Sequence, residues 1–203
     1  MAGTSASGLD VEIRRDLAEH GVEVTDLADL TQRGGRYSGE IAQVLVGWLP
    51  RTMEDPSLQE KVVRQLSVPW ARTQALQPML DLFRTAPGGS PAADARRWAV
   101  GNGLEVLATD AVFDEMAALA ADPAYGRSRQ MVVLWLGKSK QHRERAVDVL
   151  LGLLDQHDVS GHAVKALAKL KDPRSLDGLR RMTDDSRAWV RNSAKRTIQR
   201  LEA

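Results

Sequence analysis

The fold is decided by residues 159–176, VSGHAVKALAKLKDPRSL. Apolar residues recur in this stretch every three or four positions, which is the spacing of an amphipathic helix, and the Asp-Pro-Arg that follows is typical of a turn. Sliding the sequence by 31 residues in either direction superposes this helix on those predicted over 127–138 and 187–201. A repeat of this length indicates a solenoid of stacked helices.

The repeat register is carried by three positions in each of these helices. Their occupants are Val132, Leu136 and Ser139, then Ala163, Leu167 and Leu170, then Ala194, Ile198 and Leu201. From residue 38 onward the pattern predicts five pairs of an A helix and a B helix: 39–49 with 57–68, 76–84 with 93–107, 111–121 with 127–138, 143–154 with 159–171, and 173–183 with 187–201. Each helix has one apolar face and must stack on its neighbours to bury it, so we expect an all-α fold without β-structure.

The N-terminal residues do not follow the repeat. Residues 9–36 predict two short helices, and we interpret them as a cap, because the first unit of an array must present a soluble outer face. Residues 1–8 are small and polar and predict a flexible tail. The sequence thus predicts one repeat domain over 9–203, interrupted by a long loop at 85–94, TAPGGSPAAD.

Composition narrows the class of protein. Hydrophobic residues make up 43% and charged residues 27% of the 203, which are ordinary globular values. The absence of cysteine excludes disulfides, thiol nucleophiles and cysteine-ligated zinc, and it fits a reducing compartment, so we expect the cytoplasm. The first residues, MAGTSASG, lack the features of a secretion signal, and the apolar run 41–50 is about half the ~20 residues of a membrane helix. We expect no membrane association.

The charge is unevenly distributed along the chain. The formal net charge is +1, but residues 1–126 carry 11 basic and 18 acidic side chains, whereas residues 127–203 carry 17 and 9. Such an asymmetry favours an anionic partner for the C-terminal part, although surface charge can also serve solubility alone.

The runs VSGHAVKALAKLKDPRSLDGL, over 159–179, and AWVRNSAKRTIQRL, over 188–201, resemble HEAT repeats of the short bacterial kind that also occurs in phycobilin lyases. The resemblance is strong over 127–203 and weaker over 38–126. It implies a right-handed α-α solenoid with A helices outside and B helices lining a concave face. It does not imply lyase activity, because many such proteins only bind other proteins.

The repeat alignment places cations at one position in three successive B helices, and two more one turn earlier. We call these five residues the basic ladder: Lys138, Lys165, Lys169, Arg196 and Arg200. Arg191 and Lys195 extend the basic character of the last helix. Trp189 lies beside them and suits either stacking on a partner or packing at the end of the array.

Two interpretations of the basic ladder remain open. On a concave face it could follow a phosphate backbone or an acidic protein segment. It could equally be a solvated helix face. The small net charge argues against a nucleic-acid binder, which usually has a strongly basic balance.

Trp98 and Asn102 are four residues apart and share a helix face. The spacing is faintly similar to that of the tryptophan and aspartate of HEAT-like DNA glycosylases that excise alkylated bases. An amide cannot supply the carboxylate that would stabilise a developing cation, so the resemblance also argues against that activity. The repeat alignment sets Asn102 at the core position of Val132, where its amide would need a hydrogen-bond partner.

No motif points to catalysis or to a metal. Asp155, His157, Asp158 and His162 cluster around one turn, but their spacing is not a recognised ligand set, and Asp158 is more simply a helix N-cap. The sequence contains no HExxH, no GxSxG and no phosphate-binding glycine loop. We expect no metal site and no cofactor.

The leading hypothesis is a non-enzymatic scaffold that binds another protein, for example through an acidic segment, on the B-helix face. Its rival is a nucleic-acid-binding HEAT protein, related to the glycosylases but lacking the catalytic acid. A lyase-like protein that holds a bilin or another small ligand ranks last. We expect a monomer or a weak dimer.

Overall fold

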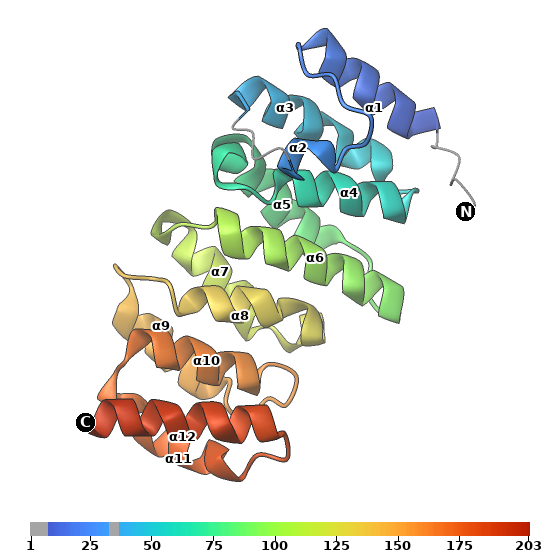
Figure 1. Cartoon of the computed structure of the whole chain (residues 1–203). Helices are drawn as coiled ribbons and strands as arrows, with labels where there is room; N and C mark the ends of the chain where they lie inside the picture. Colours follow the sequence, from blue (N-terminus) through green and yellow to red (C-terminus); the bar gives the residue numbers. More distant parts are fainter. Residues whose placement is uncertain (1–7, 33–36) are drawn as a thin grey trace. The chain divides into compact units, whose positions relative to one another are not determined.

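The computed structural model describes residues 8–32 and 37–203. Within them the chain forms twelve α-helices, joined by turns and short 3-10 segments, and no strand (Figure 1). The helices gather into two compact units, residues 1–86 and 87–203. None of the described helices is both long and apolar enough to cross a membrane. The prediction of one domain over 9–203 stays a prediction, and the predicted tail at 1–8 lies, except for Gly8, outside the described residues.

The described residues of unit 1 form five helices: α1 (Gly8–Glu19), α2 (Asp29–Gln32), α3 (Gly39–Trp48), α4 (Pro56–Leu66) and α5 (Arg72–Thr85). Helix α3 packs against α1, α4 and α5. The indole N–H of Trp48 donates to Asp16 at 2.8 Å, which ties α3 to α1. Helix α4 begins as its sequence predicts, with Pro56 in its first turn and Asp55 accepting from the backbone N–H of Leu58.

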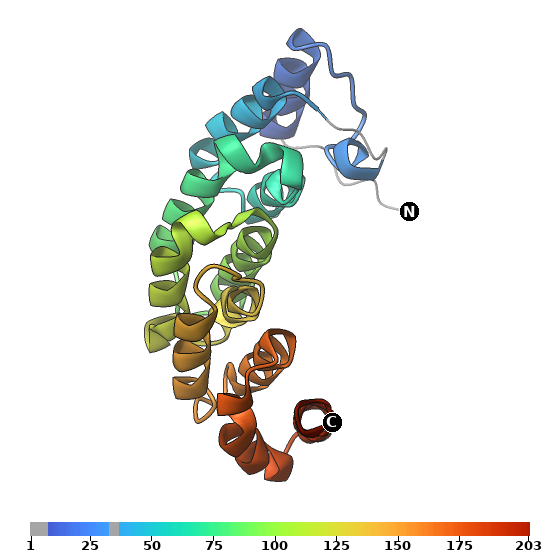
Figure 2. The same ribbon diagram turned by 90° about the vertical axis from the view of Figure 1, so that its left-hand side faces the viewer.

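Unit 2 comprises seven helices: α6 (Pro91–Leu107), α7 (Phe113–Ala121), α8 (Gln130–Leu136), α9 (Arg143–Gly152), α10 (Ser160–Leu170), α11 (Leu176–Arg181) and α12 (Ala188–Glu202). The B helices α6, α8, α10 and α12 pack one on the next and form what we call the B layer. The A helices α7, α9 and α11 each pack on the B helix that follows (Figure 2). The loop between the units is shorter than predicted, because α6 begins at Pro91 with Ser90 as its N-cap.

The predicted repeat register holds in the core of unit 2. Val132, Leu136, Ala163, Leu167 and Ala194 are all fully buried. The last helix differs, since the two remaining register positions of α12, at 198 and 201, are only half-buried.

Two glycines allow the B helices to approach closely. A side-chain carbon at Gly137 would lie 2.7 Å from the Cα of Ala166, and one at Gly161 would collide with the indole of Trp189. These positions therefore require glycine for steric reasons. The close approach fixes how α8, α10 and α12 lie against one another.

Arg129 is a buried cation that the sequence analysis did not single out. It is 2% exposed, and its guanidinium donates to the carbonyls of Ala120 at 2.6 Å and Gly126 at 3.2 Å, and to the side-chain oxygen of Gln156 at 2.6 Å. Burial lowers its pKa, which the carboxylates of Asp158 and Asp122 partly counteract. One side chain thereby joins the end of α7 to the turn before α10.

Aspartate and arginine two residues apart pin the turns on either side of α11. Asp172 accepts from the backbone N–H of Arg174 and pairs with its guanidinium, and Asp185 does the same with Arg187. Hydrogen bonds from Arg187 lower the pKa of Asp185 to about 2 against the opposing effect of burial. The Asp-Pro-Arg turn predicted from sequence is thus one of two turns held by the same aspartate–arginine interaction.

We predict that Arg129→Met lowers the free energy of unfolding by about 2–4 kcal/mol, because it leaves buried carbonyl oxygens without donors. Arg127→Met, at an exposed arginine two residues earlier, should change it by less than about 0.5 kcal/mol. Urea unfolding followed by circular dichroism measures both values. Equal losses in the two variants would contradict this role of Arg129.

We predict that Asp185 makes unfolding sensitive to acid. A carboxyl whose pKa falls from 3.8 to about 2 on folding contributes stability that is complete above about pH 5 and is lost as the pH falls towards 2. The contribution is about 2 kcal/mol. Asp185→Asn should therefore lower stability at neutral pH and flatten its decline below pH 4, whereas Asp184→Asn should do neither. A wild-type slope in Asp185→Asn would refute the assignment.

Candidate functional site

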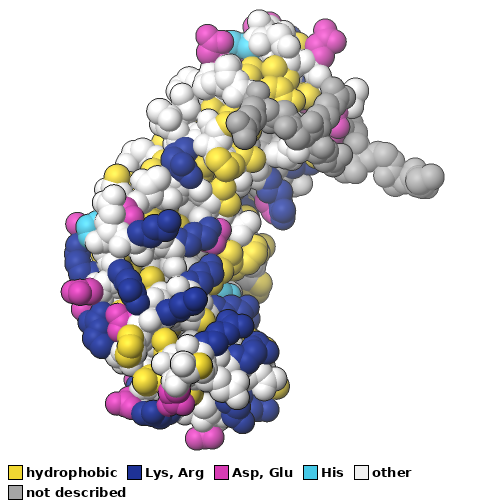
Figure 3. Space-filling view, turned by 60° about the vertical axis from the view of Figure 1, so that its left-hand side comes forward, with side chains coloured by type: hydrophobic (Ala, Val, Ile, Leu, Met, Phe, Trp, Pro, Cys, Tyr) yellow, Lys and Arg dark blue, Asp and Glu magenta, His cyan; other side chains and the backbone are white. Residues whose placement is uncertain are grey.

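The exposed side of the B layer in unit 2 presents the basic ladder. Lys138 follows α8, Lys165 and Lys169 lie on α10, and Arg196 and Arg200 lie on α12; all five side chains are exposed. Figure 3 shows Lys and Arg side chains gathered over unit 2. The prediction that these five residues contact a partner stays a prediction.

The end of the ladder next to α6 is partly neutralised by Glu105. The ammonium of Lys138 lies 2.6 Å from the Glu105 carboxylate and also donates to the Glu105 carbonyl at 3.1 Å. Burial lowers the pKa of Lys169, and the nearby ammonium groups of Lys138 and Lys165 lower it further, while Glu105 opposes them. The sequence analysis missed Glu105, although α6 lies directly beside α8 in the repeat order.

The end of the ladder on α12 has unpaired cations. Within the described ranges, Lys195, Arg196 and Arg200 form no ion pair or hydrogen bond through their side chains. Arg191 differs, because its guanidinium donates to the carbonyls of Asp185 and Ser186 at 2.8 Å each. Arg191 thereby holds the turn before α12, so the free positive charge on this helix comes from the other three residues.

Trp189 lies at the first turn of α12 and is 41% exposed. Its indole packs over Gly161 of α10, with the ammonium of Lys165 4.7 Å from the ring centroid. The guanidinium of Arg187 lies 5.8 Å away, and the imidazole of His162 meets the ring edge-on at 6.0 Å. Trp189 therefore both packs on the preceding B helix and presents apolar surface between two cations.

A pocket of about 220 Å³ lies beside Trp189, where the beginnings of α8, α10 and α12 come together. Arg127, Gln130, Asp158, His162 and Arg187 line it with Trp189. Burial lowers the pKa of His162 to about 4, and the charges of Lys165, Arg187 and Arg127 add to this effect. His162 is therefore neutral at physiological pH.

Asp158 does not cap α10, so the sequence prediction for this residue is wrong. The N-cap of α10 is Val159, which makes no side-chain capping bond. The carbonyl of Asp158 instead accepts a hydrogen bond from the side chain of Gln130 at 2.8 Å. Because the turn is held from the neighbouring repeat, the Asp158 carboxylate is available to line the pocket.

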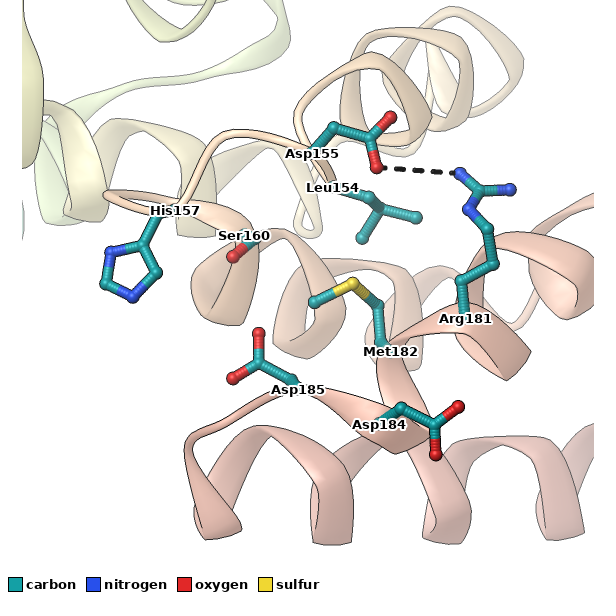
Figure 4. A pocket seen from close by; sticks show the side chains of 8 residues that line it. All are labelled: Leu154, Asp155, His157, Ser160, Arg181, Met182, Asp184 and Asp185. Carbon is teal, nitrogen blue, oxygen red and sulfur yellow. Dashed lines mark ion pairs between the residues drawn. The ribbon is translucent and has the colours of Figure 1, made fainter.

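A second pocket, of about 310 Å³, lies on the other side of this turn (Figure 4). Figure 4 shows the imidazole of His157 pointing away from Asp155, and the carboxylates of Asp184 and Asp185 pointing apart. Asp155 lies 3.9 Å from the guanidinium of Arg181. In the described part of the chain no three histidine or carboxylate side chains come together as metal ligands.

Trp98 and Asn102 share the exposed face of α6, where Trp98 is 38% exposed and Asn102 is half-buried. The prediction that Asn102 occupies the core position of Val132 is wrong. The step from α6 to α8 is 32 residues, so the buried Val100 corresponds to Val132. Arg97 on α6 and Arg129 before α8, which are both buried, are related by the same step. The amide therefore does not need the buried partner that the sequence alignment required.

Comparisons with known proteins agree with this architecture. Residues 114–199 match the family model described as HEAT repeats. A solved structure of a designed armadillo repeat protein superposes with a TM-score of 0.53 at 12% sequence identity, covering 98% of this chain and 95% of that chain. No curated protein matches the sequence. At this identity the structural likeness shows the fold alone. Residues 114–199 are thus similar to HEAT repeats, and the chain folds as an all-α solenoid.

Proposed function

We propose that this chain is a non-enzymatic interaction module whose B layer in unit 2 binds an acidic segment of another protein. The observation that carries the proposal is the set of unpaired cations on α12, continued by Lys165 and Lys169 on the adjacent helix α10. Packed helices hold the backbone positions of these residues at fixed spacing, so no backbone order has to be created on this surface when a partner binds.

The distribution of charge and aromatic surface favours a protein over a nucleic acid. The carboxylates of Glu105 and Asp158 interrupt the cations on this side of unit 2, so the surface lacks the continuous positive charge that a phosphate backbone, charged at every nucleotide, contacts. Trp98 and Trp189 each present apolar surface on B helices. Exposed tryptophans flanked by arginine and lysine are typical anchors of protein interfaces.

The geometry offers little to a catalytic mechanism. The serine hydroxyls of Ser67, Ser128 and Ser175 donate to backbone carbonyls, and that of Ser160 accepts from Arg187. None of these four bonds is the contact with a histidine that activates a serine nucleophile. We therefore assign the chain a binding role, and we propose no cofactor for it.

We predict that Lys169→Glu and Arg200→Glu each weaken binding of a fluorescein-labelled glutamate-rich peptide about fivefold, and that together they weaken it more than tenfold. Each replaces an attraction by a repulsion of similar size. Fluorescence polarisation at low salt measures the affinities, and the wild-type affinity should fall steeply as salt is added.

The matched control is Arg15→Glu, which reverses an exposed arginine in unit 1 and should leave the affinity unchanged. Equal losses in Arg15→Glu and Arg200→Glu would show that net charge alone governs binding, and would refute the placement on the B layer. A gel shift with single- and double-stranded oligonucleotides tests the rival. Tighter binding of an oligonucleotide than of the peptide, lost in the ladder variants, would replace the proposal.

A further inference from the structure

The pocket beside Trp189 is too small for a typical cofactor and large enough for a side chain. Its volume is about 220 Å³, whereas small-molecule sites usually measure about 300–1,000 Å³. It opens between α10 and α12, two helices that also carry the ladder. A segment that lies along the ladder could therefore place one side chain in it.

Charge in and around the pocket is positive after its internal pairings are counted. Arg187 is neutralised by Asp185 at 2.8 Å, and the buried Arg129 lies in the field of the Asp158 carboxylate. The side chain of Arg127 forms no ion pair with any described residue, nor does that of Lys165. Arg127 thus lines the pocket without a carboxylate partner, and the ammonium of Lys165 lies over the Trp189 ring beside it.

His162 reports the same excess of positive charge. It is half-buried, and its pKa of about 4 reflects burial first and then the three neighbouring cations. A neutral imidazole keeps one N–H donor. The pocket therefore combines uncompensated positive charge with the N–H donor of an imidazole that is already neutral at physiological pH.

The walls of the pocket are held in place before any partner arrives. Arg187 donates to the Ser160 hydroxyl at 2.6 Å and to the His157 carbonyl at 2.8 Å, which fixes its guanidinium against the turn before α10. The indole of Trp189 rests on Gly161, so the apolar wall is also fixed. Preorganised groups lose little freedom on binding.

We propose that this pocket receives the carboxylate of an aspartate or glutamate from the acidic partner segment, between Arg127 and His162, while an adjacent apolar residue of that segment lies on Trp189. The inference rests on the proposed function and names the anchor of the same surface. A carboxylate fits better than a phosphoryl group, because its single negative charge matches the Arg127 guanidinium, whereas a phosphoryl group carries about −1.5 to −2 and would meet more repulsion from the Asp158 carboxylate that also lines the pocket.

The test uses two labelled peptides of equal length, one alternating glutamate with leucine and one with glutamine in place of every glutamate. Arg127→Gln should weaken binding of the glutamate peptide about fivefold and leave the weak binding of the glutamine peptide unchanged. Trp189→Ala should weaken both, because it removes the apolar contact. Arg15→Gln is the matched control. In the NMR spectrum, the imidazole signals of His162 should shift on addition of the glutamate peptide.

The outcomes separate this inference from the function on which it rests. If Lys169→Glu and Arg200→Glu weaken binding while Arg127→Gln does not and the His162 signals stay fixed, the pocket inference is wrong and the binding surface stands. If the wild-type protein binds neither peptide, both are wrong. If a phosphoserine peptide binds more tightly than the glutamate peptide and Arg127→Gln abolishes that preference, the assignment to a carboxylate is overturned.

Discussion

Everything that unit 2 presents on its B layer depends on the close approach of successive B helices. Gly137 meets the backbone at Ala166, and Gly161 lies under the indole of Trp189. A larger side chain at Gly137 would push α8 and α10 apart, because the backbone of Ala166 leaves no room for it, and one at Gly161 would displace the Trp189 indole. This contact sets the register in which cations from three repeats line up, and it leaves Trp189 at the surface between Lys165 and Arg187.

The polar groups of unit 2 divide into those that hold the turns and those that remain free. Four arginines donate hydrogen bonds to backbone carbonyls and nearby carboxylates: Arg129, Arg174, Arg187 and Arg191. Each bond keeps an A helix or a turn in position against the B layer. The cations left over include Arg127 and, on α12, Lys195, Arg196 and Arg200, and the proposed binding of an acidic chain relies on them.

The sequence predicts those features that depend on local pattern. Helix periodicity located the A and B helices, and the cap at Asp55 and the turn at Asp172 followed from residue chemistry. Contacts across repeats were not predictable in the same way. The ion pair of Lys138 with Glu105 and the hydrogen bond of Arg129 to Gln156 each join residues about 30 positions apart. The predicted core position of Asn102 was wrong because the step from α6 to α8 is longer than the later repeat steps.

The proposed binding of an acidic protein segment places that segment on the B layer of unit 2. The most direct measurement is hydrogen exchange of the amide groups with and without the glutamate peptide, together with mapping of the side-chain signals by NMR. The account predicts changes confined to α10, α12 and the turn before α10. Changes centred on the A helices α7, α9 and α11, or on unit 1, would contradict it.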